Sequence, residues 1–314
     1  MNSILIITPY FGKMPDMYCY WEQSAINNPT IDFLIITDDK NIQGQNNIKV
    51  IYITFKECVE RFQSLFDFKI SLEKPYKLCD FKPVYGEAFA DYCKGYDFWG
   101  FGDLDLVLGD IRHFITDDIL STYWIISGWG HLTLYRNIPE CTKFYKNYEE
   151  GYPYYKNVFS SPKAFVFDEY LHGGMSDRWK KLRPDKLWDS QLFDDIVVPY
   201  LHFEFVSFNR PHCRFLIFEY NNGKLYRIFL NDDTVIREET LYAHFQQRKF
   251  MRCEAKDLNH YIIIPNKFIE YRDFDEKNII IWGKPQKFHR LLYSLYRKMK
   301  RRMKKIREMQ VIHL

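Results

Sequence analysis

Two uninterrupted apolar runs constrain the fold more than any other feature of the 314-residue chain. Residues 4–7 read Ile-Leu-Ile-Ile and residues 33–36 read Phe-Leu-Ile-Ile, and a polar residue follows each run. A strand with one face in water alternates apolar and polar residues, whereas a strand covered on both faces does not. The two runs therefore predict central strands of a parallel sheet, over residues 3–9 and 32–39.

The surrounding sequence extends this pattern into βαβ units. Residues 18–26 have the apolar spacing of a helix, and residues 49–53 are a third strand candidate. In such sheets ligands bind beyond the carboxyl ends of the strands. Thr8, Tyr10, Thr37 and Asp38 lie at the carboxyl ends of the first two strands, so we expect them in the ligand-binding region.

Farther along the chain we expect a helix over 83–93, strands over 122–126 and 132–135, and β-hairpins over 201–245 with a turn at 221–223. Hydrophobic residues make up 46% and charged residues 27% of the chain, which is typical of a folded globular protein. Aromatic residues, at 18%, suit either a sugar or nucleotide enzyme or simply an aromatic core.

Composition also limits the compartment and the cofactors. The seven cysteines form no C-x-x-C pair, so neither a zinc site nor a disulfide framework is indicated. The N-terminal residues predict no signal peptide, and no run reaches the ~18 apolar residues expected of a membrane-spanning helix. We expect a cytoplasmic protein.

The sharpest chemical signal is Asp103-Leu104-Asp105 at the end of an apolar strand. In an extended chain, residues two apart point the same way, so both carboxylates can face one cation. Mg²⁺ and Mn²⁺ prefer oxygen ligands and leave positions open for phosphate oxygens. A D-x-D also occurs by chance as a pair of turn aspartates. Here the preceding Trp99-Gly100-Phe101-Gly102 and βαβ half favour a metal site.

A cation bound by two aspartates usually takes a further protein ligand. His244 is the candidate, because the basic Arg248 and Lys249 that follow it could hold a diphosphate. Most lone histidines are ordinary polar residues. The competing histidines are His131, His172, His202 and His212.

Two further segments carry candidate residues. In Lys77-x-x-Asp80-x-Lys82 the lysines could contact phosphate and Asp80 could bind a base or ribose, although an exposed loop of mixed charge reads the same way. Asp168 or Glu169 could act as the base that deprotonates an acceptor hydroxyl, although an acidic pair at a helix start is the commoner meaning.

The C-terminal segment differs from the rest of the chain. From residue 287 onward there are ten Lys/Arg and one acidic residue, Glu308, and the apolar residues between 292 and 306 fall on one helical face. A basic amphipathic helix is typical of binding to an anionic membrane surface. A nucleic-acid arm and a merely solvated helix end are the alternatives.

Lys77-x-x-Asp80-x-Lys82-Pro83, followed by Trp99-Gly100-x-x-Asp103-x-Asp105, resembles bacterial polysaccharide-locus glycosyltransferases of the GT-A fold. Thr8-Pro9-Tyr10-Phe11-Gly12 is similar too. The resemblance implies a Rossmann-like mixed sheet flanked by helices, a nucleotide sugar bound through Mn²⁺ or Mg²⁺, and transfer to a saccharide on a lipid carrier. It implies that Asp103 and Asp105 are the metal-binding pair and that His244 is the late histidine ligand.

The resemblance covers roughly residues 1–250 and excludes the tail. We expect a catalytic domain over 1–285, with a nucleotide-sugar-binding half (1–137) and an acceptor half (138–285), and a basic tail over 286–314. The leading hypothesis is a glycosyltransferase of capsule or O-antigen synthesis, with a UDP-sugar favoured and no nucleic-acid partner expected. The tail would lie at the inner face of the cell membrane. The alternatives are a sugar phosphotransferase or nucleotidyltransferase, and a non-enzymatic membrane or nucleic-acid binding module.

Overall fold

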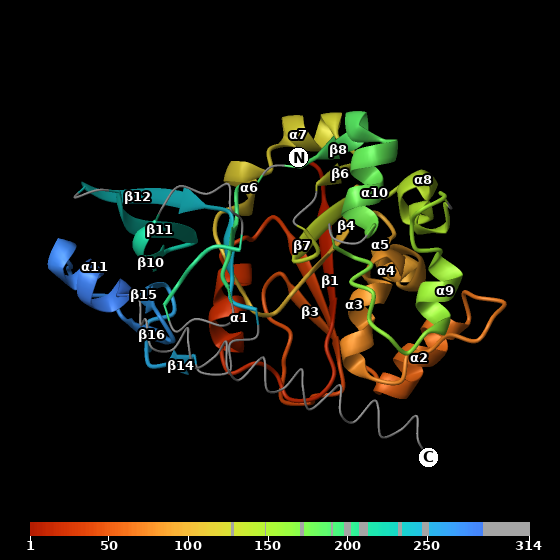
Figure 1. The fold of residues 1–314 in the computed structure, drawn as a ribbon. Helices are drawn as coiled ribbons and strands as arrows, with labels where there is room; N and C mark the ends of the chain where they lie inside the picture. The colour runs from red at the N-terminus through yellow and green to blue at the C-terminus, as the bar shows by residue number, and fades with distance from the viewer. Residues whose placement is uncertain are drawn as a thin grey trace, which may run out of the picture. The chain divides into compact units, whose positions relative to one another are not determined.

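The computed structural model describes residues 1–126, 129–147, 149–169, 173–189, 191–197, 202–206, 213–231, 234–246 and 251–284. The chain divides into two compact units, Met1–Phe193 and Asp194–Leu314 (Figure 1). The functional boundaries predicted after residues 137 and 285 stay predictions.

The first unit is built on a seven-stranded mixed sheet of order β3-β2-β1-β4-β7-β6-β8. Four neighbouring strands, β3 to β4, run parallel, whereas β7 is antiparallel to both β4 and β6. The strands of this unit are β1 (Ile4–Pro9), β2 (Asp32–Thr37), β3 (Ile48–Tyr52), β4 (Phe98–Gly102), β5 (Leu106–Leu108), β6 (Ile125–Ile126), β7 (Leu132–Arg136) and β8 (Leu187–Trp188).

The apolar runs form the centre of this sheet, as their sequence predicts. Ile7 of β1 lies between Leu34 of β2 and Phe101 of β4 in the parallel register. Every residue of the two runs is buried. Burial on both faces explains why neither run alternates with polar residues.

Most helices of the first unit pack on one face of the sheet (Figure 1). The apolar side chains there include Leu5 and Ile7 from β1, Phe62 from α2, and Phe144 stacked on Trp179 with ring centres 3.7 Å apart. The helices and 3₁₀ turns on this side are α2 (Phe55–Gln63), η1 (Pro75–Lys77), α3 (Leu78–Phe81), η2 (Lys82–Val84), α4 (Tyr85–Ala88), α5 (Ala90–Cys93), α8 (Pro139–Thr142), η3 (Phe144–Lys146), α9 (Tyr155–Ser160) and α10 (Met175–Leu182).

The opposite face of the sheet is covered by α1 (Tyr18–Ile26), the helix predicted between the first two strands. Trp21 of α1 meets Phe33 of β2 edge to face, with ring centres 5.7 Å apart. Ser24 accepts a hydrogen bond from the Leu108 backbone N–H and thereby ties α1 to β5. The remaining elements of this unit are α6 (Ile111–Phe114), α7 (Asp117–Thr122) and η4 (Pro184–Lys186).

Two sequence expectations for the first unit need correction. The helix expected over 83–93 is broken into η2, α4 and α5, because Phe89 leaves helical geometry at φ −117°, ψ 31°. The strand expected over 122–126 begins only at Ile125, because α7 runs to Thr122 and the Tyr123 N–H still donates to the Ile119 carbonyl at 2.9 Å.

The second unit contains a six-stranded sheet of order β12-β11-β10-β15-β16-β14. Its hairpin β10–β11 turns at Asn222 and Gly223, as the sequence predicts. Ile279 of α11 packs against Ile217 and Ile228 on one face of this sheet. The elements are β9 (Asp194–Asp195), β10 (Arg214–Asn221), β11 (Lys224–Asn231), β12 (Thr234–Thr240), β13 (Tyr242–His244), β14 (Arg252–Cys253), β15 (His260–Ile264), β16 (Lys267–Glu270) and α11 (Glu276–Gly283).

The α/β class expected from the sequence, a mixed sheet flanked by helices, is confirmed. The expected basic helix over 286–314 lies outside the described residues. Within the described ranges no helix is long and apolar enough to cross a membrane.

Candidate functional site

The aspartate pair follows the central strand β4. The Asp103 N–H donates to the His131 carbonyl at 2.9 Å, so the ladder between β4 and β7 continues one residue past Gly102. The chain then turns at Leu104 and Asp105 instead of staying extended. A carboxylate oxygen of Asp103 still lies within 4.8 Å of one from Asp105. That spacing allows both carboxylates to bind a single cation. The sequence predicted this approach from an extended backbone, whereas the structure achieves it with a turn.

Lys82 lies beside this pair, with its ammonium surrounded by three oxygens. Its Nζ is 2.7 Å from the Gly130 carbonyl, 2.8 Å from Asp103 Oδ1 and 2.9 Å from Asp168 Oδ2. The side chain is buried, and the two carboxylates hold the pKa of Lys82 well above its usual value against the opposing effect of burial. The lysine expected to meet phosphate is thus engaged within the protein.

Asp168, a candidate base, is also brought to this cluster. It is only 2% exposed, and its Oδ1 has no hydrogen-bond partner among the residues that the structure describes. Burial raises the pKa of Asp168 to about 6, although Lys82 acts in the opposite direction. An acceptor oxygen in this state can take a hydrogen bond or a proton from a bound hydroxyl group.

The turn before β7 closes tightly over Asp168 and the neighbouring Glu169. Gly130 has φ +94°, and a Cβ at this position would lie 2.8 Å from Glu169 Cγ and 3.2 Å from Asp168 Oδ2. Only glycine fits this approach without a shift, because it has no Cβ and adopts positive φ readily. Ser127 and Gly128, which precede this turn, lie outside the described residues.

Asp80 and Lys77 form a second buried ion pair, at 2.6 Å. Asp80 is fully buried and accepts bonds from the backbone N–H groups of Phe165 and Phe167. Lys77 donates to the Val158 carbonyl at 3.0 Å. Both side chains thus hold the segment before Asp168 through hydrogen bonds to its backbone. Their expected contacts to a nucleotide stay predictions.

The residues expected at the strand ends lie there. Thr8 donates to the Gly102 carbonyl at 2.9 Å, and Thr37 accepts from the Asp39 N–H. Asp38 accepts from the Gly12 N–H at 2.9 Å. Tyr10 is half-buried, and burial, followed by the nearby Asp105 charge, raises the pKa of its hydroxyl. Tyr10 therefore lies near the aspartate pair, at the edge where ligands of parallel sheets bind.

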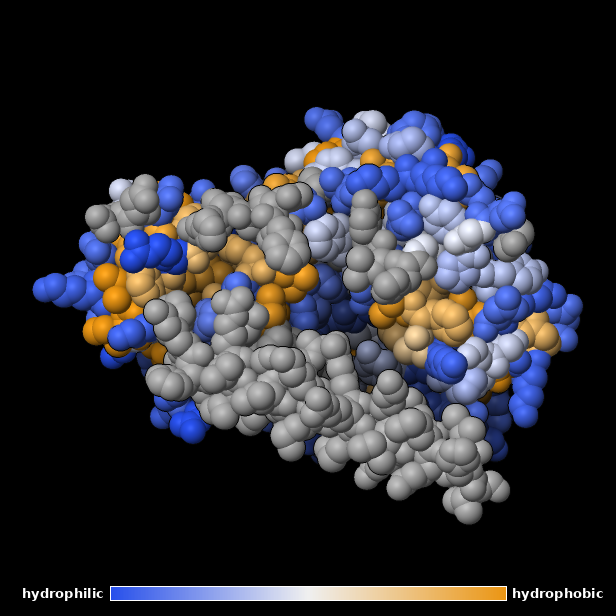
Figure 2. Space-filling model, viewed as in Figure 1, coloured by the Kyte–Doolittle hydropathy of each residue, from blue (hydrophilic) through white to orange (hydrophobic). Residues whose placement is uncertain are grey.

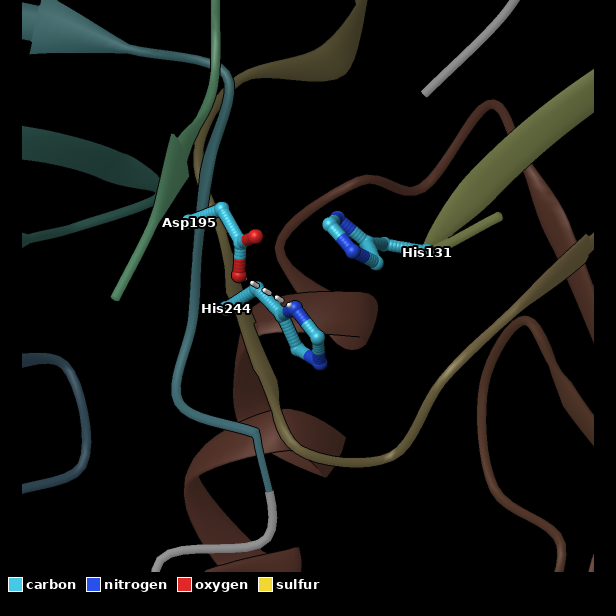
Figure 3. Close-up of side chains that lie close together, drawn as sticks. All are labelled: His131, Asp195 and His244. Atoms are coloured by element: carbon cyan, nitrogen blue, oxygen red, sulfur yellow. Dashed lines mark hydrogen bonds and ion pairs between the residues drawn. The ribbon is translucent and has the colours of Figure 1, made fainter. Parts of the chain in front are cut away.

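His244 belongs to the second unit. Strand β13 pairs in parallel with β9 and sets His244 beside Asp195 (Figure 3). The imidazole Nδ1 lies 2.9 Å from Asp195 Oδ1, which also accepts from the Gln246 side chain. A carboxylate that orients an imidazole through one ring nitrogen is typical of metal-binding histidines. His244 as a metal ligand stays a prediction.

Sequence reasoning did not single out Asp195, whose only local signal is the acidic pair Asp194-Asp195 inside an apolar stretch. Of the competing histidines, His131 stands at the start of β7 and meets Phe193 edge to face. His202 lies 3.5 Å from Glu204. His172, His212, Arg248 and Lys249 lie outside the described residues.

Comparison with protein families gives one match. The model of a family of unknown function, DUF6625, matches residues 6–272. The chain belongs to this family. Comparison with curated proteins gives no match.

Solved structures similar to this DUF6625 member include glycosyltransferases. Mouse xyloside xylosyltransferase 1, in its apo form, matches with a TM-score of 0.34 and 8% identity over 62% of this chain and 88% of its own. The galactosyltransferase LgtC with donor and acceptor sugar analogues has a TM-score of 0.24 and 15% identity over 60% of this chain and 66% of its own. An active-site variant of LgtC has a TM-score of 0.25 and 12% identity, over 60% and 67%.

Proposed function

We propose that this protein transfers a sugar from a nucleoside-diphosphate donor, with a UDP-sugar favoured, to a saccharide acceptor. The observation that carries the proposal is the gathering of Asp103, Asp105 and Asp168 at the carboxyl end of a parallel sheet. Parallel sheets bind ligands at that end. An aspartate pair that can share a cation, and a buried carboxylate joined to it through Lys82, suit a site that handles both a cation and hydroxyl groups.

Asp103 and Asp105 are the proposed ligands of a divalent cation. Both offer carboxylate oxygens, and the two lie close enough to share one ion. Such hard donors fit Mn²⁺ or Mg²⁺. When bound, the cation would stabilise the negative charge that builds on a departing diphosphate. His244 is the proposed further protein ligand, and Lys249 the proposed diphosphate contact.

Asp168 is the proposed proton acceptor for the attacking hydroxyl, with Glu169 beside it. The Oδ1 of Asp168 supports this role, because within the described ranges it has no partner and a hydroxyl donor would satisfy this buried oxygen. A pKa of about 6 keeps much of this carboxyl group ionised at neutral pH while leaving it basic enough to take a proton. Tyr10, Thr8, Thr37 and Asp38 are proposed to line the donor side.

The acceptor is proposed to be linked to a lipid carrier, with the basic segment 287–314 holding the enzyme at an anionic membrane surface. Apolar side chains gather on the second unit over β10 to β12 and α11 (Figure 2). Ile281 of α11, close to the start of the basic segment, is 69% exposed. An exposed apolar side chain six residues before the basic segment in the sequence supports the proposal, because membrane-surface helices combine apolar and basic residues. Binding to anionic vesicles with and without the segment tests it.

The experiment that tests the proposed function measures the products formed from UDP-sugars in the presence of Mn²⁺. Release of UDP together with transferred or hydrolysed sugar is expected, whereas release of pyrophosphate would indicate a nucleotidyltransferase. Asp103→Asn should lower turnover by at least about a hundredfold. The matched control is Asp118→Asn, on the exposed side of α7, which should retain activity. Undiminished turnover in Asp103→Asn contradicts the proposal.

A further inference from the structure

Lys82 has no hydrogen left for a phosphate group. An ammonium donates at most three hydrogen bonds. The carbonyl of Gly130 and the carboxylates of Asp103 and Asp168 lie within 2.9 Å of its Nζ. A phosphate could bind Lys82 only by displacing one of these partners. Lys82, one of the two lysines expected to contact phosphate, therefore needs another role.

We propose that Lys82 is the internal cation of the site, a positioning residue that holds Asp103 and Asp168 in place and reduces the negative charge a divalent cation meets. The identity of that divalent cation rests on the proposed function. The part of the proposal in which Lys82 fixes the two carboxylates does not depend on the proposed function.

The segment that carries Lys82 also holds the loop that carries Asp168. Asp80, two residues before Lys82, binds the backbone N–H groups of Phe165 and Phe167. Lys82 then binds the Asp168 side chain itself. The backbone before Asp168 and its carboxylate are thus fixed by two side chains of one short segment.

Charge explains why the cluster needs an internal cation. Asp168 is buried and Asp103 and Asp105 share one end of the sheet, so three ionised carboxylates would repel one another. The single ammonium reduces three negative charges to two, which a divalent cation can balance. Replacing Lys82 with an uncharged residue removes the positive charge that lies 2.8 Å from Asp103 Oδ1. A cation at Asp103 and Asp105 would then be attracted more strongly.

Lys82→Met tests the proposal, because methionine keeps the length and apolar stem of lysine but removes the charge. Mn²⁺ alone, measured by the electron paramagnetic resonance of the free ion, should bind roughly threefold to tenfold more tightly to Lys82→Met than to the unmodified protein. UDP affinity in saturating Mn²⁺ should not fall, while turnover of UDP-sugars should. The control is Lys146→Met, which removes a separate half-buried ion pair with Glu87 and should leave Mn²⁺ affinity unchanged.

A second measurement decides whether Lys82 fixes Asp168, whatever the protein binds. Lys82→Met should lower the melting temperature, and adding Asp168→Asn should restore part of that loss, because a neutral amide needs no counter-ion. The double variant should fold even if Lys82→Met alone does not.

Either of two results overturns the proposal. One is a tenfold or larger loss of UDP affinity in Lys82→Met with Mn²⁺ affinity unchanged, which would make Lys82 a phosphate ligand. The other is a change in melting temperature on Asp168→Asn that is the same in the unmodified protein and in Lys82→Met. If the unmodified protein binds neither Mn²⁺ nor UDP, the proposed function fails, and the melting temperatures still decide the role of Lys82.

Discussion

Gly130→Ala perturbs the turn that closes over Asp168, and its cost follows from the structure. The new methyl group would lie 2.8 Å from Glu169 Cγ and 3.2 Å from Asp168 Oδ2, at a residue with φ +94°. Holding a non-glycine residue at positive φ costs about 1–2 kcal/mol. Forcing an extra methyl group into a packed site costs about 1–3 kcal/mol more. The expected loss in the free energy of unfolding is therefore about 2–5 kcal/mol.

Gly95→Ala is the matched control, because Gly95 has φ +90° but no atom within 4 Å of an added Cβ. It should lose only the conformational part, about 1–2 kcal/mol. Urea denaturation of both variants measures the difference. Gly130→Ala should also lower turnover, because the displaced neighbours include Asp168. Equal losses of stability in the two variants would refute the claim that Gly130 is needed for the approach to Asp168 and Glu169.

Two further predictions concern other parts of the chain. Asp80→Ala should lower the free energy of unfolding by about 3–5 kcal/mol in urea denaturation, since it leaves the buried Lys77 without its counter-ion. Asp91→Ala, which removes an exposed ion pair with Arg61, should cost about 0–1 kcal/mol. Removing residues 287–314 should abolish sedimentation of the protein with anionic vesicles and should not change the amount that sediments with neutral vesicles. Unchanged binding to anionic vesicles would contradict the membrane proposal.

The sequence pattern correctly predicts those elements whose apolar residues follow a strand or helix spacing within one short segment. The apolar runs become β1 and β2, and the spacing over 18–26 becomes α1. The pattern fails at Thr122, which belongs to the last turn of α7 instead of the following strand. It also fails at Phe89, which breaks the helix expected over 83–93.

The roles of Lys82 and Asp80 could not be predicted in the same way, because their partners are distant in the chain. Asp80 binds Phe165 and Phe167, 85 and 87 residues later, and Lys82 binds Gly130, 48 residues later. Residue type and spacing identified this charged segment as important. Only the fold shows that the charges meet partners inside the protein instead of solvent.

The most direct test of the central claim, that Asp103 and Asp105 hold a cation for a nucleoside diphosphate, is thermal unfolding with UDP and other nucleoside diphosphates, in Mn²⁺ and in EDTA. A ligand that binds only the folded state, at a hundred times its Kd, stabilises it by about 2.7 kcal/mol. One diphosphate should raise the melting temperature in Mn²⁺, EDTA should remove the shift, and Asp105→Ala should lose it. A shift that survives both EDTA and Asp105→Ala, or no shift with any diphosphate, would contradict the central claim.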